Sequence, residues 1–185
     1  MNPSMIQRRK SFMAPDNLYF WTATIHNWIP LLEPDYRKEI IIQSLSWLKS
    51  NGLAEIYAYV IMPNHIHLIW QTNPKERKET VAGTLLKHTA HLFKKDLRQN
   101  AQDLLPLFKV MESNKAYAFW QRDSLAIGLF TRKVACQKLN YLHQNPVAKK
   151  WKLAEDYVSY KYSSAAFYES GIDHWGLVTH INEVI

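Results

Sequence analysis

The chain of 185 residues has a single cysteine, Cys136, and only five glycines. One thiol cannot form an internal disulfide or a cysteine-based zinc cluster, and its isolation favours a reducing compartment, expected to be the cytoplasm. No run of uncharged apolar residues is long enough to span a bilayer, so no membrane segment is predicted. The basic residues Arg8, Arg9 and Lys10 are not followed by an apolar stretch, which argues against a secretory signal.

Internal repeats, low-complexity tracts and Gly/Ser-rich linkers are also missing from the sequence. With 47% hydrophobic and 21% charged residues, the composition excludes intrinsically disordered and collagen-like classes. We therefore predict one domain over residues 1–185, with a core at about 18–147 and a basic, tyrosine-rich C-terminal extension at 148–185.

Positive charge and aromatic residues are both abundant. The formal net charge is +7, and aromatic residues make up 13% of the chain, including 7 Trp and 10 Tyr. Lysine and arginine attract phosphates regardless of base sequence. Aromatic rings stack on unpaired bases, with about 1–3 kcal/mol for each base. Together the two features favour a nucleic-acid partner.

Hydrophobic periodicity and helix breakers predict four strands and three helices. The predicted strands are 18–27, 55–62, 65–71 and 116–121, and the predicted helices are 35–49, 80–98 and 131–144. Pro106 interrupts the region between 100 and 115, which has no clear pattern. The order strand–helix–strand–strand–helix–strand is typical of the split βαβ, ferredoxin-like fold of the α+β class. We expect an antiparallel sheet with helices on one face, the other face being free for a ligand or for an added C-terminal helix that carries a tyrosine.

A His-x-His pair stands at the start of the third predicted strand. Because strand side chains alternate, His65 and His67 point to the same side, about 6.6 Å apart at a rise of ~3.3 Å per residue, and we expect that side to face solvent. Two imidazoles so placed can bind a divalent metal, but they do not complete a metal site. The alternative is a polar strand face that shows two histidines and binds no metal.

The last predicted helix carries Lys138, Tyr141 and Asn145 on one face, at positions i, i+3 and i+7. The amide oxygen of Asn145 could bind a metal, Lys138 could hold a phosphate or favour the phenolate, and the phenol of Tyr141 could act as an activated nucleophile. An ordinary amphipathic helix surface is the alternative.

Basic residues give further candidates for contacts with DNA. A stripe along the second predicted helix is either a solvated surface or a face that follows phosphates; it consists of Lys87, His91, Lys94 and Arg98. The other candidates are Arg122, Lys138, Lys149 and Lys150. Ordinary structural roles are expected for the remaining notable residues: Trp21 and Trp70 in the core or on a sheet face, Cys136 in helix packing and His88 on the surface.

Four segments together resemble the REP-associated tyrosine transposases, single-tyrosine members of the HUH superfamily. Residues 59–69, YVIMPNHIHLI, resemble the family segment YVIMPNHVHLL, and residues 119–123, FWQRD, resemble its WQRD strand. Residues 141–147, YLHQNPV, resemble YIHLNPV. The family ending PEDYPWSS is similar to EDY at 155–157 and YSS at 162–164. The segments occur in family order and span about residues 18–170.

This resemblance implies a ferredoxin-like fold and cleavage of single-stranded DNA, commonly beside a hairpin. It implies that His65 and His67 bind Mg²⁺ or Mn²⁺, that Asn145 completes the site, and that Tyr141 attacks the phosphate to give a 5′-phosphotyrosine. The expected partner is single-stranded or hairpin DNA, and the expected state is a monomer or homodimer, with the tyrosine acting on its own chain or on its partner's.

Two other classes of enzyme do not fit the sequence. A histidine-triad nucleotide hydrolase requires the motif His-x-His-x-His. Because Ile69 occupies the position of the third histidine, the sequence excludes this class. A metal hydrolase on a cupin-like barrel would need many more short strands. The remaining alternative is a non-catalytic or domesticated nucleic-acid-binding module on the same fold.

Overall fold

The computed structural model describes residues 13–73, 79–112 and 115–185. Its helices are α1 (Asp35–Ser50), α2 (Val81–Asn100), α3 (Arg132–Gln144) and α4 (Ala165–Ser170), and short 3-10 turns include η3 (Asn145–Val147). Its strands are β1 (Tyr19–Thr24), β2 (Ala54–Met62), β3 (His65–Thr72), β4 (Lys109–Glu112), β5 (Lys115–Tyr117) and β6 (Leu125–Gly128). None of the helices within these ranges is long and apolar enough to cross a membrane.

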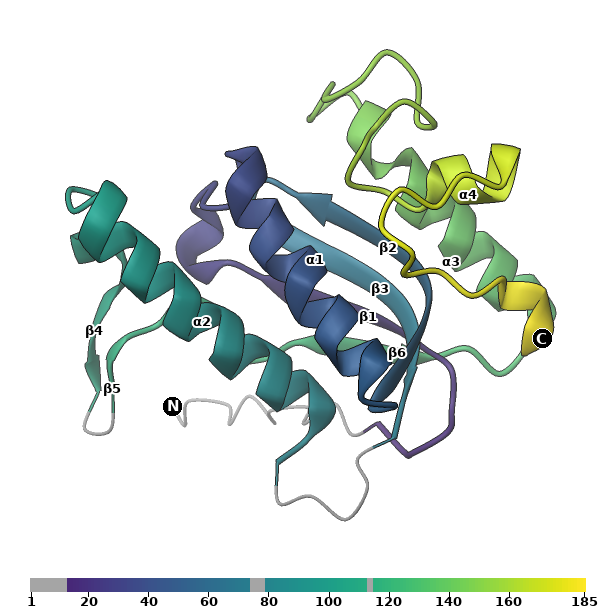
Figure 1. Ribbon diagram of the computed structural model, residues 1–185, viewed down its shortest axis with the longest axis horizontal. Helices are drawn as coiled ribbons and strands as arrows, with labels where there is room; N and C mark the ends of the chain where they lie inside the picture. Colours follow the sequence, from purple (N-terminus) through teal and green to yellow (C-terminus); the bar gives the residue numbers. More distant parts are fainter. Residues whose placement is uncertain (1–12, 74–78, 113–114) are drawn as a thin grey trace, which may run out of the picture.

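The main sheet has the strand order β2-β3-β1-β6, and each neighbouring pair is antiparallel. Helix α1 connects β1 to β2, and α2 lies between β3 and β6 in the chain, so the connectivity is that of the ferredoxin-like fold. Figure 1 shows α1 and α2 side by side over one face of the sheet, and α3 packs against β2 and β3 from the other side. The predicted α+β class is confirmed.

The fourth strand of the sheet lies later in the chain than predicted. The strand expected at 116–121 is not part of this sheet, whose fourth strand is β6. Strand β5, which overlaps the expected range, pairs with β4 in a separate two-stranded sheet. Residues 119–121 only extend the end of β1, through a bridge between Trp120 and Ile25. The aromatic side chains that suggested a strand instead pack into the core, where Phe119 stacks on Phe108 at 4.7 Å between ring centroids.

Alternation along β1 and β3 divides the sheet into two different faces. Trp21 and Trp70 are fully buried beneath the α1–α2 layer, with ring centroids 5.0 Å apart, so their predicted core role is confirmed. The opposite face carries Phe20, Thr22 and His67, because each lies one residue out of phase with this pair. The sheet thus separates the main hydrophobic core from the histidine pair.

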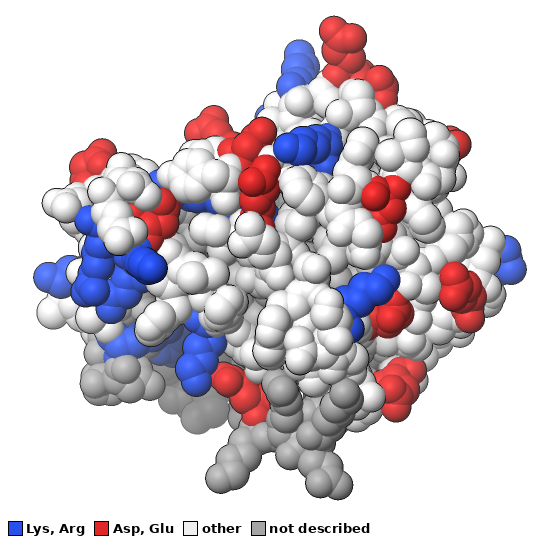
Figure 2. Space-filling view, in the orientation of Figure 1, with Lys and Arg blue, Asp and Glu red and all other residues white. Residues whose placement is uncertain are grey.

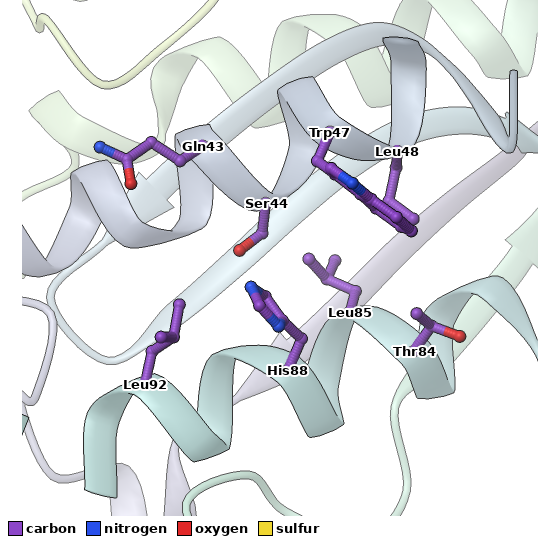
Figure 3. A pocket seen from close by; sticks show the side chains of 8 residues that line it. All are labelled: Gln43, Ser44, Trp47, Leu48, Thr84, Leu85, His88 and Leu92. Carbon is purple, nitrogen blue, oxygen red and sulfur yellow. The ribbon is translucent and has the colours of Figure 1, made fainter. Parts of the chain in front are cut away.

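The α1–α2 layer is held together by a buried ion pair, in which Arg37 Nε lies 2.7 Å from Asp96 Oδ2. On its outer side, basic side chains gather over the C-terminal half of α2 and the β4–β5 hairpin (Figure 2), where the ammonium of Lys94 lies over the ring of Tyr117 at 4.9 Å. Between the two helices runs a groove of about 460 Å³ in which His88 points toward α1 (Figure 3). His88 is exposed, as predicted for a surface residue.

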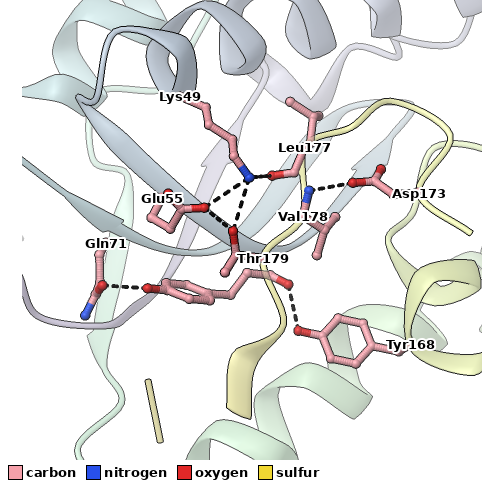
Figure 4. Close-up of polar contacts among 9 residues, drawn as sticks. Lys49, Glu55, Gln71, Tyr168, Asp173, Leu177, Val178 and Thr179 are labelled. Atoms are coloured by element: carbon pink, nitrogen blue, oxygen red, sulfur yellow. Dashed lines mark hydrogen bonds and ion pairs between the residues drawn. The ribbon is translucent and has the colours of Figure 1, made fainter. Parts of the chain in front are cut away.

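The C-terminal extension closes the free edge of β2. Val60 forms an antiparallel bridge with Ser163, and Ile56 a parallel bridge with Val178. Figure 4 shows polar contacts beside the second bridge, among them the hydrogen bond that Lys49 donates to the Leu177 carbonyl at 2.8 Å. The amide of Ile61 donates to the Tyr162 carbonyl and the amide of Thr179 donates to the Ile56 carbonyl, which satisfies backbone groups that an open edge strand would leave exposed. The extension is therefore packed onto the sheet and is part of the folded core.

Candidate active site

The histidine pair lies where β3 begins, directly after the turn at Pro63 and Asn64. The ring centroids of His65 and His67 are 4.8 Å apart, so both imidazoles are on the same side of the strand as expected. The expectation that they face solvent is wrong, because each residue is only 6% exposed. Phe20 from β1 stacks on His67 with centroids 5.0 Å apart, and Trp151 lies 5.7 Å from His65.

Each imidazole is oriented by a hydrogen bond at Nδ1. His65 Nδ1 lies 2.8 Å from the side-chain oxygen of Asn64, which can only accept, so this nitrogen carries the proton. His67 Nδ1 lies 2.7 Å from the hydroxyl of Thr22. When Nδ1 is protonated, Nε2 keeps its lone pair for a metal. Histidines that bind metals are commonly oriented in this way by neighbouring polar groups.

Burial keeps both imidazoles neutral. It lowers the pKa of His65 to about 4, with a further contribution from the positive charge of Lys150. It lowers the pKa of His67 to about 3, with smaller contributions from His65 and from Lys138. Neutral imidazole is the form that binds a metal, so near neutral pH both side chains are in that form without losing a proton.

Helix α3 brings Tyr141 to the histidine pair. The helix begins at the cap Thr131, whose hydroxyl accepts a hydrogen bond from the amide of Val134, and its buried side includes Ala135 and Leu142. The ring of Tyr141 lies 5.7 Å from that of His67, yet the residue is 51% exposed. The phenol therefore stands beside the imidazoles of its own chain and is open to a macromolecular substrate.

Two other residues of the predicted helix face are close by. The ammonium of Lys138 lies 5.6 Å from the ring centroid of Tyr141 and 5.2 Å from that of Phe20. The side-chain amide of Asn145 donates to the carbonyl oxygen of Tyr141 at 3.0 Å. Because the nitrogen is used in this bond, the amide oxygen is the atom that Asn145 can offer to a metal or to water.

The donor set suits a loosely enclosed divalent ion. In the described part of the chain, no group of three His, Cys, Asp or Glu side chains could hold a metal. The protein would therefore supply two imidazole nitrogens and the amide oxygen of Asn145, with water or a phosphate oxygen in the other positions. Mg²⁺ usually keeps several waters and binds few protein ligands, so these residues fit it or Mn²⁺.

The predicted DNA contacts divide into two groups. Lys138 and Lys150 lie at the site, since the charge of each lowers the pKa of one of the two histidines. Lys149 is exposed and adjacent to Lys150. Arg122 follows two residues after Trp120, which bridges to Ile25 at the end of β1 that pairs with His65. The basic stripe on α2 lies over the sheet face opposite the histidine pair and therefore away from the candidate site. The stripe comprises Lys87, His91, Lys94 and Arg98.

Sequence reasoning missed the residues that support the site. Thr22 can be linked to His67 only through the β1–β3 register, which pairs these two positions. Trp28, whose ring centroid lies 6.3 Å from that of His65, gave no signal because it lies in an irregular turn after β1. Cys136 was predicted to pack against a neighbouring helix and is instead exposed. Asn64 belongs to the segment at 59–69, and its position directly before His65 is the clue that the sequence offers.

The site thus combines a His-x-His strand of a ferredoxin-like sheet with a helix that places a tyrosine beside it. Among solved structures, the chain is similar to a REP-associated tyrosine transposase bound to a REP hairpin, with a TM-score of 0.59 and 16% identity over 86% of this chain and 82% of that one. It is also similar to a putative transposase from Deinococcus radiodurans, with a TM-score of 0.44 and 14% identity over 75% of this chain and 97% of that one. No family model and no curated protein matches the sequence. The first likeness establishes that the two proteins share a fold.

Proposed function

We propose that the protein is a metal-dependent enzyme that nicks and rejoins single-stranded DNA near hairpins, as a transposase does. The observation that carries this proposal is the contact between Tyr141 and His67, whose ring centroids are 5.7 Å apart although they come from α3 and β3. A half-exposed phenol beside two neutral, oriented imidazoles suits phosphate chemistry better than core packing. The hairpin bound to the REP-associated transposase of the same fold supports a hairpin-bearing substrate.

In the proposed reaction, the phenol oxygen of Tyr141 attacks a backbone phosphate in line. A bond forms between that oxygen and phosphorus, and the bond from phosphorus to the 3′-oxygen breaks. The strand ends are then a 5′-phosphotyrosine and a free 3′-hydroxyl, which gains one proton as the phenol loses one. One phosphodiester replaces another, so the reverse reaction rejoins the strand without ATP.

The residues around Tyr141 have separate roles in this reaction. His65, His67 and Asn145 would hold Mg²⁺ or Mn²⁺, which supplies charge stabilisation to the phosphate oxygens. Lys138 lies near both Tyr141 and Phe20 and offers a second positive charge to the same phosphate. Phe20 packs against His67 and Tyr141, with centroids 5.0 and 5.9 Å away, and keeps the two rings in place.

A non-catalytic nucleic-acid-binding module is the second candidate function. The basic surface around Tyr117 favours it, because Lys94, Arg98 and Lys109 lie there, apart from the histidines. Such a surface binds DNA without cutting it. This alternative leaves the contact between Tyr141 and the histidine pair without a role.

The two candidates are separated by incubating the full chain with hairpin-bearing single strands. We expect cleavage on denaturing gels with Mg²⁺ or Mn²⁺ and none with EDTA. Binding with no cleavage in either metal, across single strands of varied sequence beside the hairpin, would favour the non-catalytic module.

A further inference from the structure

Two tryptophans and a lysine surround the outer side of His65. Trp28 follows β1, and its ring centroid lies 6.3 Å from that of His65. Trp151 follows η3, and its ring lies 5.7 Å from the same imidazole. The ammonium of Lys150 lies 5.6 Å from the ring of Trp28 and 5.0 Å from the ring of Trp151. Two loops far apart in the sequence thus meet beside one metal-binding histidine.

Trp28 is held exposed by an unfavourable backbone. Its φ is 59° and that of Asn27 is 53°, in the left-handed region that side chains rarely adopt. The turn is fixed from both sides, because the amide of Trp28 donates to the Ile25 carbonyl at 3.0 Å and Asn64 donates to the Trp28 carbonyl at 3.0 Å. The indole is 54% exposed, so the strain serves to present it to solvent, where packing gains little.

The same asparagine connects this indole to the candidate active site. Asn64 donates through its amide nitrogen to the carbonyl of Trp28 and accepts at its oxygen from Nδ1 of His65. The position of the indole relative to the imidazole is therefore fixed by one buried side chain. A ligand stacked on Trp28 would lie at a defined distance from the histidine pair.

The chemistry of the cluster selects the kind of ligand. Indole faces bind flat aromatic rings or cations. A cationic ligand would be repelled by Lys150, whose ammonium already lies over both indoles. A flat ring that carries a negative phosphate meets both requirements, since stacking and charge then act together. An unpaired nucleotide has this combination, whereas the bases of a duplex are covered by their neighbours.

We propose that Trp28, Trp151 and Lys150 form a clamp for one unpaired base of the DNA strand, next to the phosphate at the histidine pair. The base stacks on the indoles and Lys150 contacts a phosphate of the same strand. This proposal rests on the function proposed above for the site and adds how the strand is held there. Because every base has a flat face, the clamp tolerates any base in this position.

The test measures binding separately from cleavage. Affinities of the full chain for a labelled single strand and for a duplex of equal length are measured by fluorescence anisotropy, without metal and in a Tyr141→Phe background. Trp28→Gly removes the indole and suits the positive φ, so the turn and the thermal midpoint should be preserved. We expect single-strand affinity to fall about tenfold, from the loss of one stacked base, with duplex affinity unchanged.

A matched control is Trp47→Ala, because Trp47 is 50% exposed on α1 but lies on the other side of the sheet. It should leave both affinities unchanged. The clamp is overturned if Trp28→Gly binds the single strand as tightly as its parent, if the parent binds no single strand, or if Trp47→Ala causes an equal loss. Cleavage by the unmodified chain is measured in a separate experiment. A selective loss of single-strand affinity in Trp28→Gly supports the clamp even if the unmodified chain does not cleave DNA. Absence of cleavage would refute only the proposed function.

Discussion

The hydroxyl of Thr22 on β1 lies 2.7 Å from Nδ1 of His67 on the neighbouring strand β3. The two residues are direct partners in the antiparallel register. The bond engages Nδ1, so Nε2 is the ring nitrogen available to a ligand. A threonine on one strand thus orients an imidazole on the neighbouring strand.

Thr22→Val should weaken metal binding with little effect on folding. Valine has nearly the same shape as threonine but cannot hydrogen-bond to His67, and loss of such an orienting partner typically costs 10–100-fold in metal affinity. Titration with Mn²⁺ measures this change, and Thr22→Ser, which keeps the hydroxyl, should bind as the parent does. Equal affinity in the valine and serine variants would show that the hydroxyl does not orient the ring.

His67→Ala should remove metal binding and also reduce stability, by about 1–3 kcal/mol, because the buried ring packs against Phe20. Urea unfolding measures the stability loss. Mn²⁺ should raise the thermal midpoint of the parent but not that of the variant, since a ligand stabilises only a state that binds it. His88→Ala, at an exposed position on α2, should change neither quantity, and a metal-induced rise that persists in His67→Ala would place the metal elsewhere.

Much of this organisation could be predicted from the sequence. The alternation in β3 is a local pattern that placed His65 and His67 on one side of the strand, and the helix predicted at 131–144 corresponds to α3, which carries Tyr141. Burial of the histidines could not be predicted, because Phe20 and Trp151 reach them from distant parts of the chain. The fourth strand was misplaced because the aromatic residues at 119 and 120 signal burial, and burial does not distinguish a strand from a segment packed against a helix.

Asp96→Ala should destabilise the protein strongly, by about 3–5 kcal/mol. The substitution leaves the guanidinium of Arg37 buried without its carboxylate partner, which lies 2.7 Å away. Lys87→Ala on the same helix is the control, because its ion pair with Glu79 is exposed and 3.6 Å long, and it should cost less than about 0.5 kcal/mol. Equal losses in urea unfolding would mean that the buried pair does not join α1 to α2.

Stability should fall as the pH is lowered from about 6.5 toward 4. Burial lowers the pKa of His143, which is hydrogen-bonded to Ser164, to about 4, and it lowers those of His65 and His67 in the same direction. In this range the unfolded chain binds more protons than the folded one, so the free energy of unfolding decreases with each step to lower pH.

Between pH 6.5 and 4, each such histidine changes the free energy of unfolding by up to about 1.4 kcal/mol per pH unit. Its contribution to stability is fully present above pH 6.5. Urea unfolding at several pH values measures the slope. His143→Gln can keep a hydrogen bond to Ser164 and should make the slope smaller by one histidine's share. A slope that is the same in both proteins would mean that His143 is not buried as a neutral group.

The most direct test of the central claim is whether Tyr141 becomes covalently joined to DNA. A hairpin-bearing single strand labelled on the 3′ side of the cleavage site is incubated with the full chain and Mg²⁺ or Mn²⁺ and then separated under denaturing conditions. The predicted result is a labelled protein–DNA band that survives heating and is absent in Tyr141→Phe, whose ring still packs beside His67 and whose folding should be unchanged. Cleavage by the parent without this band, or an undiminished band in Tyr141→Phe, would contradict the assignment of Tyr141 as the nucleophile.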